Sequence, residues 1–186
     1  MLSSFLSRRA LLTYIATFGC IASCGSMFAP DLYGQTTYFD KLWQNYPNGT
    51  PGAVLKSIGG NVQQNNFANT CTIRASRAFN YAGTLVPGPT EAKKIGMNVV
   101  SGADKRWYAY RVKEFHAYMV KLYGQPHITS KGGSGIPAEM KGKKGVIEFV
   151  GALGGDSTGH FDIWDGKNCK YQEYFKDAKQ VYLWKM

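Results

Sequence analysis

Two kinds of apolar spacing divide this chain, and their order constrains its fold more than any other feature of the sequence. Toward the N-terminal side, as at residues 39–46, apolar residues recur every three or four positions, which is the spacing of one helix face. Short apolar runs at 145–150, 159–164 and 181–184 are typical of buried strands. Helices followed by strands predict an α+β domain with a mostly antiparallel sheet.

The helical spacing predicts one further feature, the placement of a cysteine at a helix start. We expect helices at residues 39–46, 51–58, 70–82 and 112–123. Asn69 or Thr70 can cap the third of these, and Gly83 is a natural stop, so Cys71 lies in the first turn. The segments expected to be loops or irregular are 61–69, 85–102 and 125–142, with a short extended segment at 107–110.

Length and charge limit the classes of protein that the chain can belong to. Its 186 residues, of which 44% are hydrophobic, suit a single core, which we assign to residues 31–186. The net charge of +10 favours polyanions in general. The basic residues are scattered, however, and the densest group, Lys141, Lys143 and Lys144, is expected in a solvated loop. Without zinc-finger spacing or a basic helix carrying aromatics, nucleic acid is not an expected partner.

The first thirty residues have the pattern of an export segment. Arg8-Arg9 precedes an apolar run that is short for a membrane span. The arginine pair followed by this run resembles a twin-arginine signal. The tetrapeptide Ile21–Cys24 also resembles a lipobox, in which the cysteine is lipidated. We therefore expect residues 1–30 to direct export to the periplasm or the medium, with membrane anchoring only through a lipidated Cys24. The alternative is an upstream start codon that adds a meaningless extension.

Cys71 is the first candidate for chemistry. The positive end of a helix stabilises a thiolate, which is the form that acts as a nucleophile. A lone cysteine is nevertheless more often a buried structural residue. The four cysteines form no CxxC pair and have no histidine cluster beside them, so no structural metal is expected. A disulfide between Cys71 and Cys169 stays open, and it would disable a nucleophile.

His160 and Asp162 are the next candidates. Alternate residues of a strand share a face, so His160, Asp162 and Trp164 point to one side, and Phe161 and Ile163 to the other. Polar groups on a face suited to a core need partners. A nucleophile, a base and a carboxylate that orients the base would supply them. A satisfied polar pair within the core is the other interpretation, and the pattern alone does not separate the two.

Six segments occur in an order that resembles one family. They are Ile58–Val62 (IGGNV), Asn69–Ser76 (NTCTIRAS), Val100–Asp104 (VSGAD) with Tyr108–Val112 (YAYRV), Gly142–Ile147 (GKKGVI) and Gly159–Gly166 (GHFDIWDG). Together, over roughly residues 39–186, they resemble the fourth family of type VI secretion amidase effectors, which are compact NlpC-type, papain-like enzymes.

The resemblance implies an antibacterial amidase without a cofactor. Its substrate would be peptidoglycan stem peptides, cut as by a DL-endopeptidase between D-glutamate and meso-diaminopimelate. The family's nucleophile corresponds to Cys71 and its base to His160. The Cys71 backbone N–H would help to hold the oxyanion, and water would release the acyl-enzyme.

The chain departs from the family in two places. The family's third catalytic residue is an aspartate shortly after the cysteine that matches Cys169, but here residues 170–173 read Lys-Tyr-Gln-Glu. We expect Asp162 to take that role because it shares a face with His160, and Glu173 is the alternative. The second departure is the export segment, which effectors delivered by a type VI machine normally lack.

Three functions therefore stay open at the level of sequence. The first is a wall-cutting amidase, either a toxin or a remodelling enzyme. The second is a catalytically inactive lipoprotein that binds the wall, which the missing family aspartate favours. The third is a papain-like protease or acyltransferase on another substrate. A cognate immunity protein would accompany a toxin, and the sequence leaves its existence open.

Overall fold

A computed structural model describes residues 36–151, 153 and 158–186, so the export segment expected at residues 1–30 lies outside the described part. The helices are α1 (Tyr38–Asn45), α2 (Pro51–Ile58), α3 (Gly60–Gln64), α4 (Cys71–Ala82), α5 (Pro89–Lys94) and α6 (Val112–Tyr123), with a 3-10 turn at Ala138–Met140. The strands are β1 (Val99–Ser101), β2 (Trp107–Ala109), β3 (Ile128–Lys131), β4 (Gly145–Val150), β5 (Gly159–Trp164) and β6 (Gln180–Lys185). The predicted α+β class is confirmed.

Capping residues explain where the N-terminal helices start and stop. Thr37 and Asp40 form a reciprocal capping box at α1, in which each side chain accepts the other's backbone N–H. Thr50 caps α2, whose first residue is Pro51. Helix α4 ends at Gly83, where φ is 106°, a left-handed value that glycine adopts without strain.

The predictions of loops at 61–69, 85–102 and 125–142 are wrong in part. The first contains most of α3, the second contains α5 and β1, and the third contains β3 and the 3-10 turn. These elements have three to six residues each, which is too short for a periodic apolar pattern to be read. Two of them, α3 and α5, each bury one apolar side chain, Val62 and Ala92 respectively.

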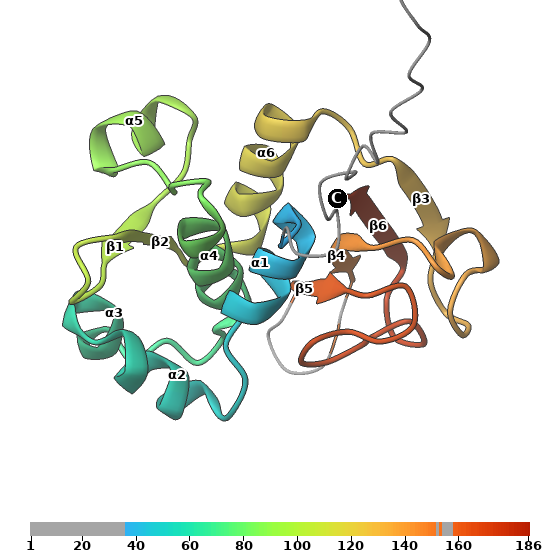
Figure 1. The fold of residues 1–186 in the computed structure, drawn as a ribbon, viewed down its shortest axis with the longest axis horizontal. Coiled ribbons are helices and arrows are strands. Elements are labelled where there is room, and N and C mark those ends of the chain that lie inside the picture. Colours follow the sequence, from blue (N-terminus) through green and yellow to red (C-terminus); the bar gives the residue numbers. More distant parts are fainter. Residues whose placement is uncertain (1–35, 152, 154–157) are drawn as a thin grey trace, which may run out of the picture. The chain divides into compact units, whose positions relative to one another are not determined.

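The main sheet has the order β3-β6-β4-β5, and every neighbouring pair is antiparallel. Figure 1 shows α1, α4 and α6 gathered beside this sheet, with the β1-β2 hairpin beyond α4. The core between helices and sheet includes Phe115 of α6, which meets Phe161 of β5 edge to face at a centroid distance of 4.9 Å. A second core lies around Phe149 and Trp164.

Strand β5 has the alternation that its sequence predicts. Phe161 and Ile163 belong to the core on the helix side, whereas Trp164 belongs to the second core. His160 and Asp162 share the face of Trp164, and they contact each other. The polar pair is therefore built into the sheet rather than attached through a loop.

The outer edge of β5 is covered by two groups from elsewhere in the chain. The Tyr46 hydroxyl donates to the Phe161 carbonyl at 2.8 Å, and the Lys170 N–H donates to the Ile163 carbonyl at 2.8 Å. An edge strand with free carbonyls invites unwanted pairing, and both contacts prevent it. The second contact also brings the segment after Cys169 against the strand that carries His160.

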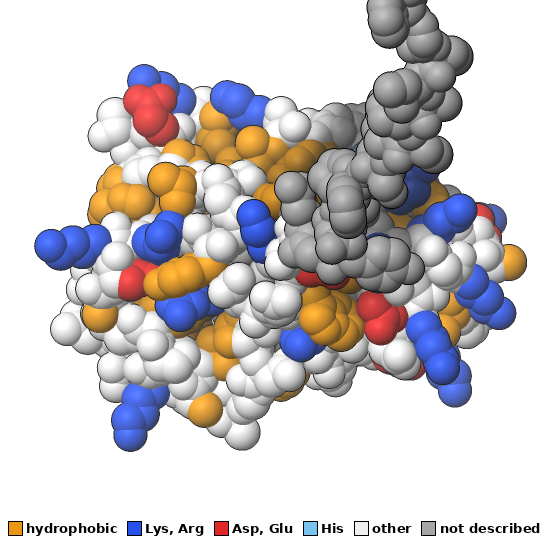
Figure 2. Space-filling view, in the orientation of Figure 1, with side chains coloured by type: hydrophobic (Ala, Val, Ile, Leu, Met, Phe, Trp, Pro, Cys, Tyr) orange, Lys and Arg blue, Asp and Glu red, His pale blue; other side chains and the backbone are white. Residues whose placement is uncertain are grey.

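Basic side chains are dispersed over the surface, as the sequence analysis expected. Lys141, Lys143 and Lys144 are exposed, and on the face drawn in Figure 2 the Lys and Arg side chains stand apart from one another. Among the helices of the described ranges, none has both the length and the apolar character needed to cross a membrane.

Candidate active site

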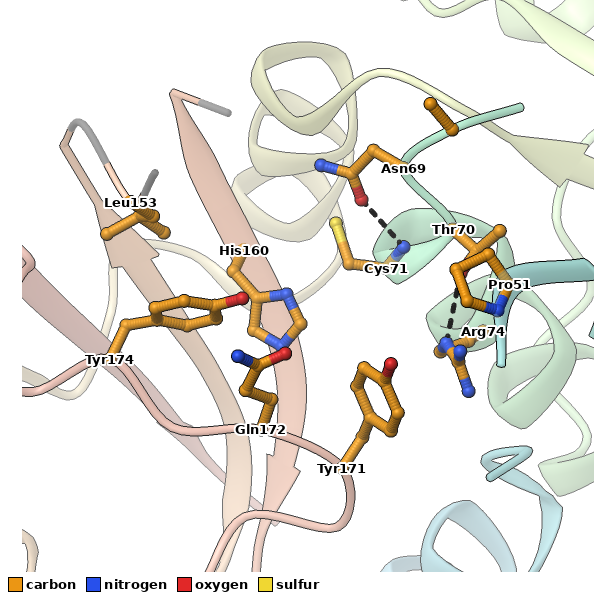
Figure 3. A pocket seen from close by; sticks show the side chains of 11 residues that line it. Pro51, Asn69, Thr70, Cys71, Arg74, Leu153, His160, Tyr171, Gln172 and Tyr174 are labelled. Carbon is orange, nitrogen blue, oxygen red and sulfur yellow. Dashed lines mark hydrogen bonds between the residues drawn. The ribbon is translucent and has the colours of Figure 1, made fainter. Parts of the chain in front are cut away.

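Cys71 is the first residue of α4, in the first turn as predicted, and its side chain is buried. Its backbone N–H donates to Asn69 Oδ1 at 3.0 Å, as the dashed line in Figure 3 shows. Of the two capping candidates, Asn69 therefore makes this contact, and Thr70 makes no side-chain cap. The expectation that the Cys71 N–H is available to an oxyanion differs from this structure, because Asn69 occupies that donor.

His160 approaches Cys71 from β5. The Cys71 thiol is close enough to the imidazole to influence its pKa, and His160 Nε2 lies 3.2 Å from Asp162 Oδ2. Figure 3 shows the thiol and the ring facing each other across the junction of α4 and β5. The Tyr174 ring meets the imidazole edge to face at a centroid distance of 5.0 Å. These contacts hold the ring in one orientation, with one nitrogen toward the thiol and the other toward Asp162.

Asp162 is fully buried and held by the backbone. Its Oδ1 accepts the N–H of Ile163 at 2.7 Å, and its Oδ2 accepts the N–H of Gln172 at 2.8 Å. Longer bonds at 3.1–3.2 Å come from the N–H groups of Lys170 and Tyr171. A buried carboxylate without such donors would be costly. The segment that lacks the family aspartate thus supplies the donors that hold Asp162 in place.

The surroundings of His160 favour its charged form. Burial by itself lowers the pKa of the imidazole, but the hydrogen bonds to Asp162 and Cys71, together with the charges of both groups, raise that pKa to about 9. An imidazolium beside a thiol is the ionisation state in which a thiolate can form at neutral pH.

Glu173 and Cys169 are the alternatives that the structure does not place at this contact. Glu173 is exposed and lines a different pocket, together with residues 135–136 and 174–177. Cys169 and Cys71 are both free thiols, so they form no disulfide. Burial raises the pKa of the Cys169 thiol well above its ordinary value, and the nearby Asp162 carboxylate adds to the effect. Cys169 is therefore kept in the unreactive form.

The remaining histidines lie elsewhere. His116 Nδ1 contacts Glu148 Oε2 at 2.6 Å, and His127 Nδ1 accepts the N–H of Lys185. Within the described ranges, no cluster of three or more His, Cys, Asp or Glu side chains could hold a metal ion. Tyr108 is fully buried, and its hydroxyl donates to Asp104.

The thiol and the imidazole lie in a pocket of about 380 Å³. Its lining includes four residues that the sequence analysis did not single out, namely Arg74, Tyr171, Gln172 and Tyr174. Arg74 stands three positions after Cys71, on an adjacent part of the same helix, and that spacing is the one signal that pointed to it. The family resemblance pointed to the segment after Cys169, but it gave no role to Tyr171, Gln172 or Tyr174, because their contacts with the site are tertiary.

A thiol and an imidazole that line one pocket, with a buried carboxylate behind the imidazole, are the arrangement that hydrolases with a cysteine nucleophile use. The family model described as type VI secretion system (T6SS) amidase effector protein 4, Tae4, matches residues 67–184. The chain therefore belongs to the Tae4 family of type VI secretion amidase effectors, and the resemblance seen in the sequence is confirmed at that level.

Solved structures agree with this assignment. The type VI effector Tae4 from Enterobacter cloacae is 31% identical, with a TM-score of 0.69, over 80% of this chain and 95% of that one. The effector Tae4 from Salmonella typhimurium, crystallised with the immunity protein Tai4 from Enterobacter cloacae, is 27% identical, with a TM-score of 0.70, over 80% and 98%. No curated protein matches the sequence at a significant level.

Proposed function

We propose that this chain is a peptidoglycan amidase that cuts by nucleophilic catalysis, with Cys71 as nucleophile, His160 as base and Asp162 as the carboxylate that orients the base. The observation that carries the proposal is the arrangement of three side chains in a chain of an amidase family. The Cys71 thiol and the His160 ring face each other in one pocket, and Asp162 Oδ2 lies 3.2 Å from the far side of that ring. A papain-like, NlpC-type enzyme is the class in which we place it.

The reaction would proceed in two stages. The Cys71 thiolate attacks the amide carbonyl carbon and forms a carbon–sulfur bond, and the imidazolium of His160 gives its proton to the leaving amine. A thioester remains on Cys71. His160 then takes a proton from water, the resulting hydroxide attacks the thioester, and the acid product leaves as the thiol is regenerated. Asp162 stays ionised throughout and keeps the imidazole oriented.

The oxyanion of the tetrahedral intermediate needs donors near Cys71. The Cys71 N–H is the nearest backbone donor on α4, and Asn69 Oδ1 accepts it in the free protein. We infer that the Asn69 side chain gives up this N–H when substrate binds.

For the substrate, we propose the bond between D-glutamate and meso-diaminopimelate in stem peptides, a proposal that membership of the amidase effector family supports. The +10 net charge of the chain is compatible with the anionic bacterial envelope. A toxin of this kind needs a cognate immunity protein in the producing cell, and two of the solved Tae4 structures are complexes with Tai4 immunity proteins.

The test is digestion of purified diaminopimelate-type peptidoglycan by the protein and by a Cys71→Ala variant, followed by mass analysis of the fragments. New termini at the D-glutamate–diaminopimelate bond, absent with the variant, would support both the substrate and the nucleophile. Intact peptidoglycan after treatment with a folded wild-type protein would overturn the proposal in favour of wall binding without cleavage. A protein substrate assayed in parallel distinguishes a papain-like protease.

Export is a separate proposal that rests on residues outside the described part. We propose that residues 1–30 direct export and that Cys24 is the lipidated residue if the segment is a lipoprotein signal. Incorporation of labelled palmitate, lost in a Cys24→Ala variant, would support the anchor, and release of an unlabelled, shortened protein would point to a cleaved signal instead.

A further inference from the structure

Arg74 is a buried arginine whose bonds are all directed inward. Its guanidinium group belongs to α4 and has no exposed surface. Within α4 it bonds backward, because Nε donates to Thr70 Oγ1 at 3.1 Å. This fixes the residue immediately before the nucleophile, at the point where the chain enters the helix (Figure 3).

The two terminal nitrogens of Arg74 hold a second segment. One donates to the Pro47 carbonyl and the other to the Gly49 carbonyl, both at 2.7 Å. These carbonyls belong to the turn between α1 and α2, directly before Pro51, which lines the pocket. A planar guanidinium can reach three acceptors in different directions at once, and a lysine ammonium at this site could not match them with the same geometry.

The face of the guanidinium makes a third contact. Its Cζ atom lies 3.9 Å from the centroid of the Tyr171 ring, which is within the range of a cation–π contact. The backbone N–H of Tyr171 donates to both carboxylate oxygens of Asp162 at 3.2 Å. Arg74 is therefore linked indirectly to both groups. Thr70 joins it to the nucleophile, and Tyr171 joins it to the carboxylate that holds the base.

We propose that Arg74 is a positioning residue of the active site, which links the start of α4 to the 170–172 segment and thereby keeps Cys71, His160 and Asp162 in register. It touches neither the thiol nor the imidazole. Its effect passes through Thr70 on one side and through the Tyr171 stack on the other. The inference rests on the proposed function, but its first readout needs no substrate.

That first readout is the reactivity of the Cys71 thiol. Iodoacetamide alkylates thiolates, and peptide mass analysis separates Cys71 from Cys169. In Arg74→Lys and in Tyr171→Leu, we expect Cys71 alkylation at pH 6 to slow by about tenfold, because the imidazolium that stabilises the thiolate is moved away from the thiol. Tyr171→Phe keeps the ring over the guanidinium and should restore the rate relative to Tyr171→Leu.

Arg77→Lys is the matched control. Arg77 lies one turn further along α4, stacks on Tyr81 and pairs with Asp104 at 3.4 Å, so the same substitution is made on the same helix away from the pocket. We expect it to leave Cys71 alkylation unchanged. Thermal unfolding of every variant separates loss of fold from loss of register.

The second readout is the pH dependence of turnover on muropeptides. The titratable groups that face His160 from the described elements around it are Cys71 of α4, Asp162 of β5 and Tyr174 of the following loop. In Tyr171→Leu, we expect kcat to fall more than KM changes, and the alkaline limit of kcat to move to lower pH.

The inference is overturned if Arg74→Lys and Tyr171→Leu lower the melting temperature but leave two quantities of the folded protein as in the wild type. These are the rate of Cys71 alkylation and the alkaline limit of kcat. It is also overturned if Arg77→Lys slows alkylation as much as Arg74→Lys does. If no variant or wild-type protein cuts muropeptides, the proposed function fails, and the alkylation series still decides the role of Arg74.

Discussion

Oδ2 of Asp162 lies 3.2 Å from Nε2 of His160, two positions apart on the edge strand β5. The same oxygen also accepts the N–H of Gln172. The carboxylate that faces the proposed base is thus supplied by the same strand and is held by the segment in which the aspartate expected from the family resemblance is missing. The missing aspartate after Cys169 therefore no longer argues for an inactive protein, because another carboxylate, that of Asp162, lies beside the imidazole.

Asp162→Asn tests this relationship. An amide keeps the shape but presents an NH₂ group to backbone donors and loses the charge beside His160, so we expect kcat/KM to fall by about 10²–10⁴-fold. A buried backbone N–H would then face the NH₂ group of the new asparagine side chain and lose its acceptor. We therefore also expect the free energy of unfolding to fall by about 1–3 kcal/mol. The measurement is muropeptide cleavage, corrected for the folded fraction from urea unfolding.

Glu173→Gln is the control for Asp162→Asn, since it removes the alternative carboxylate. Glu173 is exposed and lines a separate pocket, so we expect kcat/KM and its pH dependence to stay as in the wild type. A large loss in Glu173→Gln with little effect of Asp162→Asn would reverse the assignment of the third residue.

The wild-type pH profile gives a second prediction. His160 has a pKa raised to about 9, and its protonated form is needed to give a proton to the leaving amine. Activity should therefore hold as pH rises past the ordinary imidazole range, and should fall as pH passes about 9. Because the folded pKa is the higher one, the associated stability is fully present below the unfolded value near 6.5 and is lost as pH rises through about 9. An alkaline limit near 6.5 would contradict the site geometry.

The two free cysteines of the described residues, Cys71 and Cys169, give a third prediction. The pKa of the Cys169 thiol is raised by burial and by the charge of Asp162, so at pH 7 we expect iodoacetamide to modify Cys71 first and to abolish cleavage as it does so. Cys169→Ser should keep this inactivation at the wild-type rate. If the Cys71→Ser variant still cuts and iodoacetamide still abolishes its cleavage, then Cys169 carries the reactive thiol and the assigned nucleophile is wrong.

The sequence predicts the parts of the fold whose contacts lie within one element. Helices α2 and α6 and strands β4 and β5 have the bounds that apolar spacing predicts, because long periodic segments bury one face or both. The pairing of His160 with Asp162 also follows from strand alternation alone. Apolar spacing does not predict short elements such as α3 and β3, because their stability comes from a neighbour in space rather than from their own pattern.

What the sequence could not predict at the site are backbone contacts. The N–H groups of Lys170, Tyr171 and Gln172 hold Asp162, and backbone donors are the same for every residue type other than proline. The engagement of the Cys71 N–H by Asn69 is likewise invisible in a pattern of side chains. Arg74 was quoted in a family motif but was given no role, because its acceptors are carbonyls of a distant turn.

The last prediction concerns the edge strand that carries the base. The Tyr46 hydroxyl is buried and donates to the Phe161 carbonyl at 2.8 Å, so Tyr46→Phe leaves that carbonyl without its donor while keeping the ring. We expect a loss of about 1–3 kcal/mol in the free energy of unfolding, because a buried acceptor then lacks a partner. Urea unfolding with an unchanged m-value measures it. Tyr110→Phe is the matched control, since the Tyr110 ring stacks on Phe67 and the change should cost less than about 0.5 kcal/mol. Equal effects of the two substitutions would mean that water replaces the Tyr46 hydroxyl at the edge of β5, and that the strand holding His160 is more open than its contacts indicate.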